Sequence, residues 1–268
     1  MTMEPSPLLD MHCHLGFANN AAQLARELGG QGGALCATVS PSEYEALRDG
    51  LSGMPSVKVG LGLHPWWLHD GRCTERDVQR CVELAEGAPF IAEVGLDFGK
   101  RCASSRDIQR RAFEQICAVA AQTGGKVLSL HAVSSVDVVL EILERAGVVG
   151  RAESSCAVIL HWYSGSSDAL QHAVRLGCFF SINPRMLQTK RGREYARILP
   201  EDRLLLETDL PPSAGGSFSA AEFAGTLVRT LSDLEALRGA SLGARIAATS
   251  RALLNWNSEA AAPARLPR

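Results

Sequence analysis

The sequence has no Cys-x-x-Cys pair among its eight cysteines, and no apolar run in it is long enough to span a membrane. Scattered cysteines fit neither a zinc site built from thiolates nor a compact disulfide framework, so we expect reduced and mostly buried thiols. The net charge of −2 provides no broad excess of positive charge for nucleic acid or for an anionic membrane. Because no basic segment followed by an apolar core occurs near Met1, we expect a cytoplasmic protein that contacts no membrane.

Neither an internal repeat nor a low-complexity linker divides the 268 residues, of which 46% are hydrophobic. A chain of this length and composition can bury one large core. We therefore expect a single domain over residues 1–268 with a frayed tail at 260–268, and no obligate protein partner. Two smaller domains are the less favoured alternative.

Eight apolar segments of strand length recur along the sequence, at residues 8–12, 34–39, 57–63, 90–95, 127–131, 157–161, 178–182 and 204–208. Helical periodicity separates many of them, as at residues 106–122, and continues after the last of them at 220–237 and 242–256. Strands of nearly continuous apolar character suit a parallel sheet that is covered on both faces. Eight of them are the number that a closed (β/α)8 barrel needs, so we predict an α/β fold of the TIM-barrel type. An open doubly wound sheet is the alternative.

His12 and His14 end the first of these segments. In an extended chain, residues two apart point the same way, so the two imidazoles project together while Cys13 faces the opposite side. A lone histidine beside an apolar run is more often a hydrogen-bonded core or surface residue than a ligand. For the isolated pair, metal binding and a structural role are about equally favoured.

Four further candidate metal ligands end other segments, namely Glu93, His131, His161 and Asp209. The carboxyl ends of the strands of a parallel barrel open onto one face, where barrel enzymes place their chemistry. Six ligands exceed what one tetrahedral ion uses, so we expect two divalent ions, roughly 3.5–4 Å apart, with Glu93 as the bridge. The nitrogen and oxygen ligands suit Zn²⁺ or Mn²⁺, and they do not exclude Mg²⁺. With Asp209 as the catalytic group that orients or deprotonates a metal-activated water, the predicted reaction is hydrolysis.

Several short motifs occur in a fixed order: Asp10-Met-His-Cys-His14, Gly62-Leu-His64-Pro65, Glu93-Val-Gly-Leu-Asp97, His131, His161-Trp-Tyr-Ser-Gly165 and Glu207-Thr-Asp209. Together they resemble the TatD family of metal-dependent deoxyribonucleases, within the amidohydrolase superfamily. The resemblance implies a barrel in which His12, His14, Glu93 and Asp209 hold one ion, while Glu93, His131 and His161 hold the second. It also implies a nuclease that often removes nucleotides from a 3′ end, with single-stranded or 3′-terminal DNA as substrate.

Two further residues are expected beside the ligands. His64 lies where the family carries a histidine near the metals, which suggests contact with a substrate phosphate or support of a ligand. The alternative for His64 is a helix-capping or loop histidine. Glu207 precedes Asp209 by two residues, and we expect it to support the ligands from behind.

The sequence departs from the family pattern around the substrate. The family usually has an arginine two residues after the histidine of the fifth strand, and here Ala132 and Val133 follow His131. The basic residues Arg185, Lys190 and Arg191 could supply the missing positive charge along a phosphate backbone. They could equally form a solvated helix face, which is the usual role of such a run.

Trp66 and Trp67 follow the Gly62-Leu-His64-Pro65 motif, on what we expect to be a loop at the active face. Their rings could stack a base or pack over the mouth of the barrel. Three hypotheses therefore remain: a TatD-like phosphodiesterase acting as a 3′–5′ exodeoxyribonuclease, a metallohydrolase of a small amide, ester, lactone or phosphoester, and a non-catalytic metal-containing binding protein.

Overall fold

The fold is an eight-stranded parallel barrel, seen in a computed structural model that describes residues 7–150 and 156–255. Each strand pairs in parallel with the next one in the chain. The strands are β1 (Asp10–Cys13), β2 (Ala34–Ala37), β3 (Val57–Leu63), β4 (Phe90–Asp97), β5 (Val127–Val133), β6 (Ala157–His161), β7 (Phe179–Ile182) and β8 (Leu204–Leu206).

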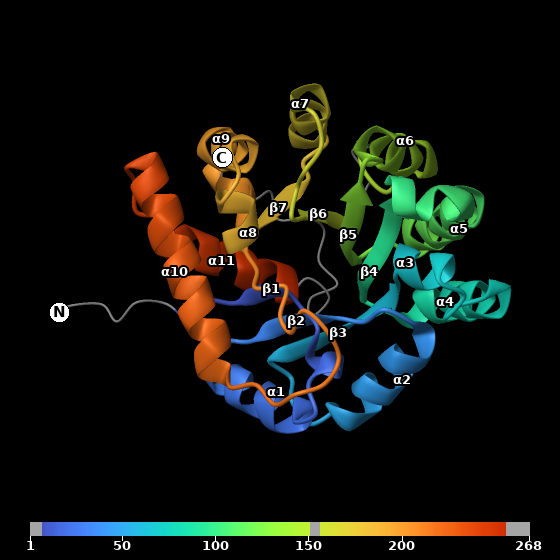
Figure 1. Cartoon of the computed structure of the whole chain (residues 1–268), viewed down its shortest axis with the longest axis horizontal. Helices are drawn as coiled ribbons and strands as arrows, with labels where there is room; N and C mark the ends of the chain where they lie inside the picture. Colours follow the sequence, from blue (N-terminus) through green and yellow to red (C-terminus); the bar gives the residue numbers. More distant parts are fainter. Residues whose placement is uncertain (1–6, 151–155, 256–268) are drawn as a thin grey trace.

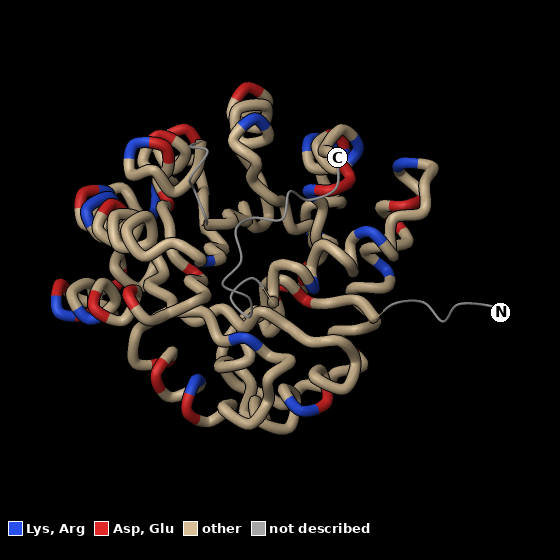
Figure 2. The backbone as a smooth tube through the Cα atoms, turned by 180° about the vertical axis from the view of Figure 1, so that it is seen from behind, with Lys and Arg blue, Asp and Glu red and all other residues tan. Residues whose placement is uncertain are grey.

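Helices connect the strands and lie around them (Figure 1). They are α1 (Ala21–Gly30), α2 (Pro41–Gly50), α3 (Pro65–His69), α4 (Glu75–Gly87), α5 (Arg106–Thr123), α6 (Val136–Ala146), α7 (Ser167–Arg175), α8 (Pro184–Leu187), α9 (Lys190–Ile198), α10 (Ala220–Arg238) and α11 (Gly243–Leu254). Acidic and basic residues are interspersed along the outer helices (Figure 2). No described helix is both long and apolar enough to cross a membrane.

The first and last strands are joined at a seam of hydrogen bonds. The buried carboxylate of Asp10 accepts bonds from the backbone N–H of Thr208 (3.0 Å) and from its hydroxyl (2.5 Å). The backbone N–H of Asp209 donates to the carbonyl of His12 (3.0 Å), and the N–H of His14 donates to the carbonyl of Leu210 (2.8 Å). These contacts bring the ring nearly to closure, which confirms the predicted barrel and rejects the open sheet.

An apolar cluster joins the strands of the barrel to the end of α11. Buried residues from the strands, such as Met11, Ile159 and Leu205, form a cluster with Leu253 and Leu254 at the end of α11. In Figure 1, α11 lies between α10 and β1, with one end toward the ring of strands. Full burial of a side chain of this size contributes about 1.5–3 kcal/mol, so this contact anchors the last described helix to the barrel.

The boundaries of most predicted elements agree with the structure. Trp66 and Trp67 lie in the short helix α3 and not in a loop, because His64 caps it and Pro65 takes its first position. Strand β8 ends at Leu206, so Glu207 and Asp209 follow the strand. The predicted tail at 260–268 lies outside the described residues, and the single domain over residues 1–268 stays a prediction.

Candidate metal centre

Glu93 lies at the centre of the predicted ligands, where the two oxygens of its buried carboxylate face different histidines. Oε2 is 3.5 Å from Nε2 of His12 and 3.5 Å from Nε2 of His14. Oε1 is 2.7 Å from Nδ1 of His131 and 3.0 Å from Nε2 of His161. The structure therefore brings two pairs of histidines to opposite oxygens of one carboxylate.

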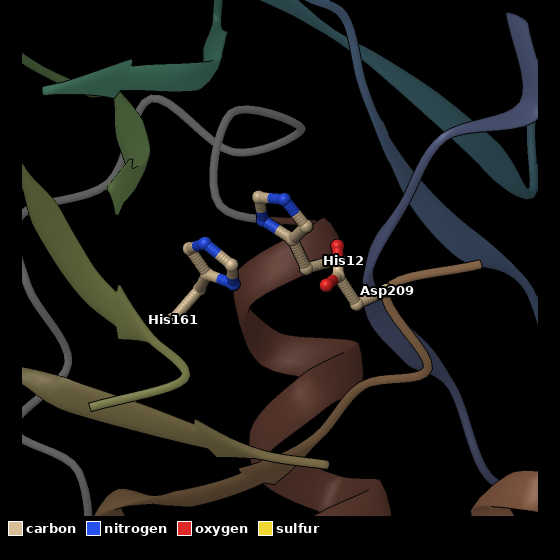
Figure 3. A group of neighbouring side chains, drawn as sticks. All are labelled: His12, His161 and Asp209. Atoms are coloured by element: carbon tan, nitrogen blue, oxygen red, sulfur yellow. The ribbon is translucent and has the colours of Figure 1, made fainter. Parts of the chain in front are cut away.

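Asp209 reaches the same centre from the segment that follows β8. Its Oδ1 is 3.4 Å from Nε2 of His14. Its backbone φ of 57° lies in the left-handed region, which short polar residues such as Asp tolerate better than most. Figure 3 shows its carboxylate beside the rings of His12 and His161, which stack with their centroids 4.0 Å apart.

The nitrogen and oxygen atoms of the histidine, Glu93 and Asp209 side chains lie close enough together to bind a common ion. Within the described part of the chain, three overlapping groups offer atoms that are all within 4.8 Å of one another. The groups are His12 with His161 and Asp209, His12 with His14 and Glu93, and His64 with Glu93 and His131. Every predicted ligand belongs to at least one of these groups.

Three of the histidines hold one ring nitrogen in a contact behind the centre. The contacts are His12 Nδ1 to Ser129 Oγ (2.8 Å), His131 Nε2 to Asp97 Oδ2 (3.4 Å) and His161 Nδ1 to Glu207 Oε1 (3.3 Å). The second nitrogen of each ring then faces Glu93. Histidines that bind metals are commonly oriented in this way by a partner on the far nitrogen.

The charges around His161 indicate that a cation belongs at the centre. A carboxylate only accepts hydrogen bonds, so a neutral His161 that donates from Nδ1 to Glu207 turns a lone pair on Nε2 toward Glu93. Burial opposes a charge on the ring, but Glu207 and Glu93 raise the pKa of His161 well above its usual value. A proton relieves the repulsion between the two lone pairs, and a metal ion would do the same.

Two buried ring nitrogens have no hydrogen-bond partner among the described residues, namely Nε2 of His12 and Nδ1 of His14. A buried polar atom without a partner costs about 1–3 kcal/mol. Burial, followed by the charge of His161, lowers the pKa of His12, which favours a neutral ring with a free lone pair. The nitrogen and oxygen donors present here therefore fit divalent metal ions.

Residues 9–255 match the protein family described as "TatD related DNase". The chain belongs to the TatD family. This match covers nearly all the described residues, and it confirms the resemblance that the ordered motifs indicate.

Named relatives of this TatD-family chain include nucleases and a hydrolase. The chain is 31% identical over 195 residues to the "3'-5' ssDNA/RNA exonuclease TatD" of Klebsiella pneumoniae (strain 342), covering 70% of this chain and 69% of that protein. It is 26% identical over 221 residues to the human "Deoxyribonuclease TATDN3", covering 76% and 78% of the two chains. It is 27% identical over 159 residues to the "Uncharacterized metal-dependent hydrolase YabD" of Bacillus subtilis (strain 168), covering 58% and 59%.

Solved structures agree with the fold of this TatD-family chain. The TatD homolog YJJV of Escherichia coli K12 superposes with a TM-score of 0.72 at 21% identity, covering 93% of this chain and 95% of that one. The organophosphorus hydrolase of Deinococcus radiodurans superposes with a TM-score of 0.57 at 14% identity, covering 93% and 92%. At these identities the likeness concerns the fold alone.

A cavity of about 630 Å³ opens beside the metal centre. Its lining includes Glu93, His131, His161 and Asp209, together with the aromatic side chains of Phe17, Trp66, Trp67 and Trp162. Ala132 and Val133 line it where TatD proteins usually carry an arginine, so this wall is apolar. The volume lies in the ordinary range for a small-ligand site.

Of the three predicted substrate cations, Arg185 alone lines the cavity. Its Nη1 is 4.0 Å from Oδ2 of Asp209, and its guanidinium lies 5.4 Å from the ring centre of Trp162. Lys190 and Arg191 are exposed at the start of α9 and are not part of the lining. The basic stretch is therefore divided, with one residue at the cavity and two outside it.

His64 is the capping residue that one alternative predicted, and it also lies beside Glu93. It caps α3, where its Nδ1 accepts a bond from the backbone N–H of Trp66 (3.1 Å), and its Nε2 lies 3.3 Å from Oε2 of Glu93. Because Nδ1 accepts, a neutral His64 carries its proton on Nε2. Burial lowers the pKa of His64 to about 4, so the ring is a neutral donor at neutral pH.

Residues behind the ligands were only partly foreseen. Glu207 is fully buried and accepts hydrogen bonds from the side chains of Ser181 and Asn183, as well as contacting His161. The supporting roles of Asp97 and Ser129 were not predicted. The alternation of side chains along each strand could have indicated both residues. Asp97 lies on the same face of its strand as Glu93, and Ser129 lies on the same face as His131.

Proposed function

We propose that the chain is a divalent-metal-dependent hydrolase, a phosphodiesterase that removes nucleotides from single-stranded or 3′-terminal DNA. The observation that carries this proposal is the set of histidines around Glu93. The far nitrogens of His12, His131 and His161 contact polar partners, and one ring nitrogen of each of these histidines and of His14 faces the Glu93 carboxylate. The names of the relatives, nucleases in several organisms, support the choice of substrate.

We assign His12, His14, Glu93 and Asp209 to one ion and Glu93, His131 and His161 to a second, with Mg²⁺, Mn²⁺ and Zn²⁺ as the ions to test. Such ions lower the pKa of water and polarise a phosphoryl group when they are bound. The division follows the two oxygens of Glu93, because Oε2 faces His12 and His14 while Oε1 faces His131 and His161.

Asp209 is assigned as the base that accepts the proton of the attacking water. Burial alone would raise its pKa, but a hydrogen bond from His14 and the charge of His161 lower it, so the carboxylate is ionised at neutral pH. Asp209 also lines the cavity, so an attacking water can reach it.

Two donors are placed to hold the phosphate. His64 lines the cavity with its Nε2 3.3 Å from Oε2 of Glu93, and the guanidinium of Arg185 lies 4.0 Å from Oδ2 of Asp209. Nε2 of His64 and the guanidinium of Arg185 are both donors, and ionised phosphate oxygens are acceptors. Lys190 and Arg191 are assigned to a more distant part of the bound DNA strand, because they are exposed outside the cavity.

A metallohydrolase of a small ester, amide, lactone or phosphoester is the second candidate. The apolar wall formed by Ala132 and Val133 favours it, because the phosphate-binding arginine expected there is absent. A cavity of about 630 Å³ also suits a compact substrate.

The test is a time course on a 5′-labelled single-stranded DNA oligomer with Mg²⁺ or Mn²⁺, run beside the Asp209→Asn variant and a chelated control. We expect a ladder that shortens from the 3′ end and that both controls lack. An intact oligomer together with rapid hydrolysis of a small ester would replace the nuclease with the second candidate. Metal binding with no hydrolysis of either substrate would leave the non-catalytic protein.

A further inference from the structure

Trp66 lies both in the wall of the cavity and directly behind the metal centre. It is 39% exposed, and it lines the cavity together with Trp67. Its ring centre is 5.9 Å from that of His131 and 5.1 Å from that of His64. A residue that served only as a hydrophobic wall would need no polar contact with the residues around the candidate ligands.

The indole nitrogen of Trp66 donates a hydrogen bond of 2.6 Å to Oδ2 of Asp97. The same oxygen lies 3.4 Å from Nε2 of His131, and Oδ1 of Asp97 accepts from the backbone N–H of Gly99 (2.8 Å). Because a carboxylate only accepts, Nε2 of His131 carries the proton in this contact. By the same rule, Nδ1 of a charged His131 donates to Oε1 of Glu93, 2.7 Å away, and a bound metal ion would take the place of that proton.

We propose that Trp66 is a positioning residue for the metal centre, whose indole N–H fixes the Asp97 carboxylate that in turn orients His131. This inference rests on the proposed function, in which His131 is a metal ligand. Partners behind a ligand commonly change metal affinity 10- to 100-fold when they are removed. Trp66 would thus link the cavity wall to the ion on the His131 side.

The contacts of Asp97 agree with this arrangement. Its carboxylate is buried, and it is held by Trp66, Gly99 and His131. Without the indole donor, Oδ2 would lose its shortest contact, and the carboxylate would be held by Gly99 and His131 alone.

Trp67 provides a matched control within the same helix. It lines the same cavity, and its ring packs against the guanidinium of Arg72 at 4.2 Å. Among the described residues, no hydrogen bond joins its indole nitrogen to Asp97 or to a ligand. Replacing Trp67 with phenylalanine removes an indole N–H from the cavity wall but leaves the contact with Asp97 in place.

The experiment measures the affinity of the full chain for Mn²⁺ by titration calorimetry after chelation, without DNA. We expect Trp66→Phe to weaken the Mn²⁺ step assigned to His131 by about 10-fold, and Trp67→Phe to change it by less than about 2-fold. We expect the double variant Trp66→Phe/Asp97→Asn to bind Mn²⁺ as tightly as Asp97→Asn alone, because both substitutions interrupt the same series of contacts.

Equal affinity in Trp66→Phe and the parent would overturn the proposal, and so would an equal loss in both tryptophan variants or fully additive losses in the double variant. If Trp66→Phe does not fold, Asp97→Asn takes its place, and unchanged affinity there overturns the proposal as well. A parent chain that binds no Mn²⁺ in this titration refutes it together with the metal assignment. Because DNA is left out, a chain with the expected metal affinities but no nuclease activity would refute the proposed function alone.

Discussion

Arg185→Gln is the substitution that most directly separates the two candidate substrates. The change removes the one predicted substrate cation that lines the cavity and keeps a polar side chain of similar length. Arg185 lies 4.0 Å from Asp209, and about half of its side chain is exposed, at 52%. Its main partners are therefore the cavity and the ring of Trp162, and not the hydrophobic core.

The expected loss follows from the charge that Arg185 offers to a phosphodiester. Two unit charges about 4 Å apart interact by roughly 4 kcal/mol at an effective dielectric constant of about 20, and solvent at a half-exposed group reduces this. A hydrogen bond to a charged group contributes about 1.5–3 kcal/mol. Since about 1.4 kcal/mol is a factor of ten, we expect kcat/KM on DNA to fall about 10- to 100-fold.

The assay compares initial rates on single-stranded DNA and on a neutral carboxylic ester such as p-nitrophenyl acetate, at two salt concentrations. The matched control is Arg110→Gln, which makes the same change of charge on an exposed part of α5, away from the cavity. We expect Arg185→Gln to affect DNA selectively, with a weaker salt dependence than the parent. Lys190→Gln and Arg191→Gln should have smaller effects, because these residues do not line the cavity.

An unchanged rate on DNA in Arg185→Gln would refute the assignment of Arg185 to the phosphate. Equal losses on DNA and on the neutral ester would refute the electrostatic argument, because they would indicate a general disturbance of Asp209.

Three further predictions concern the metal centre and the residues behind it. Glu93→Ala should lower the metal content, measured by elemental analysis, to one ion per chain or fewer. His12→Ala should lower it less, because Glu93 faces both histidine pairs. Full metal content in both variants would contradict the ligand set. Asp209→Asn should reduce kcat about 10²- to 10⁴-fold while the thermal midpoint shifts little, and a parent-like kcat would exclude Asp209 as the base. Asp97 has a folded pKa of about 2, below its unfolded value, so its stabilisation is present above about pH 4 and is lost as the pH falls toward 2. In urea unfolding of the metal-free protein, the parent should lose roughly 2 kcal/mol over this range relative to Asp97→Asn, whereas parallel profiles would contradict the contact with His131.

The fold and the convergence of the candidate ligands were predictable because both follow from simple rules of strand geometry. Alternation along a strand places His12 beside His14, and a parallel barrel brings the ends of all its strands to one face. These two rules predict that ligands from β1, β4, β5 and β6 meet, as they do around Glu93. The same alternation would have indicated Asp97, which lies four residues after Glu93.

The cavity wall was less predictable because it depends on connections between the strands. Helix α3 has only five residues, too few for a helical period to be recognised, so Trp66 was expected in a loop. The position of Arg185 over Trp162 depends on how the segments after β6 and β7 lie against each other. No spacing in the sequence records that relation, because the two residues belong to separate connections.

The seam between β1 and β8 also has a consequence for how the site comes into existence. Asp10 and Thr208 are 198 positions apart in the chain, yet their side chains hold the two edges of the ring together. His12 and His14 follow one edge of this seam, and Asp209 follows the other. His12 and His14 are synthesised long before Asp209. The full set of candidate ligands can therefore assemble only after nearly the whole chain has emerged. We therefore expect metal uptake at these candidate ligands to be a late event that follows closure of the ring.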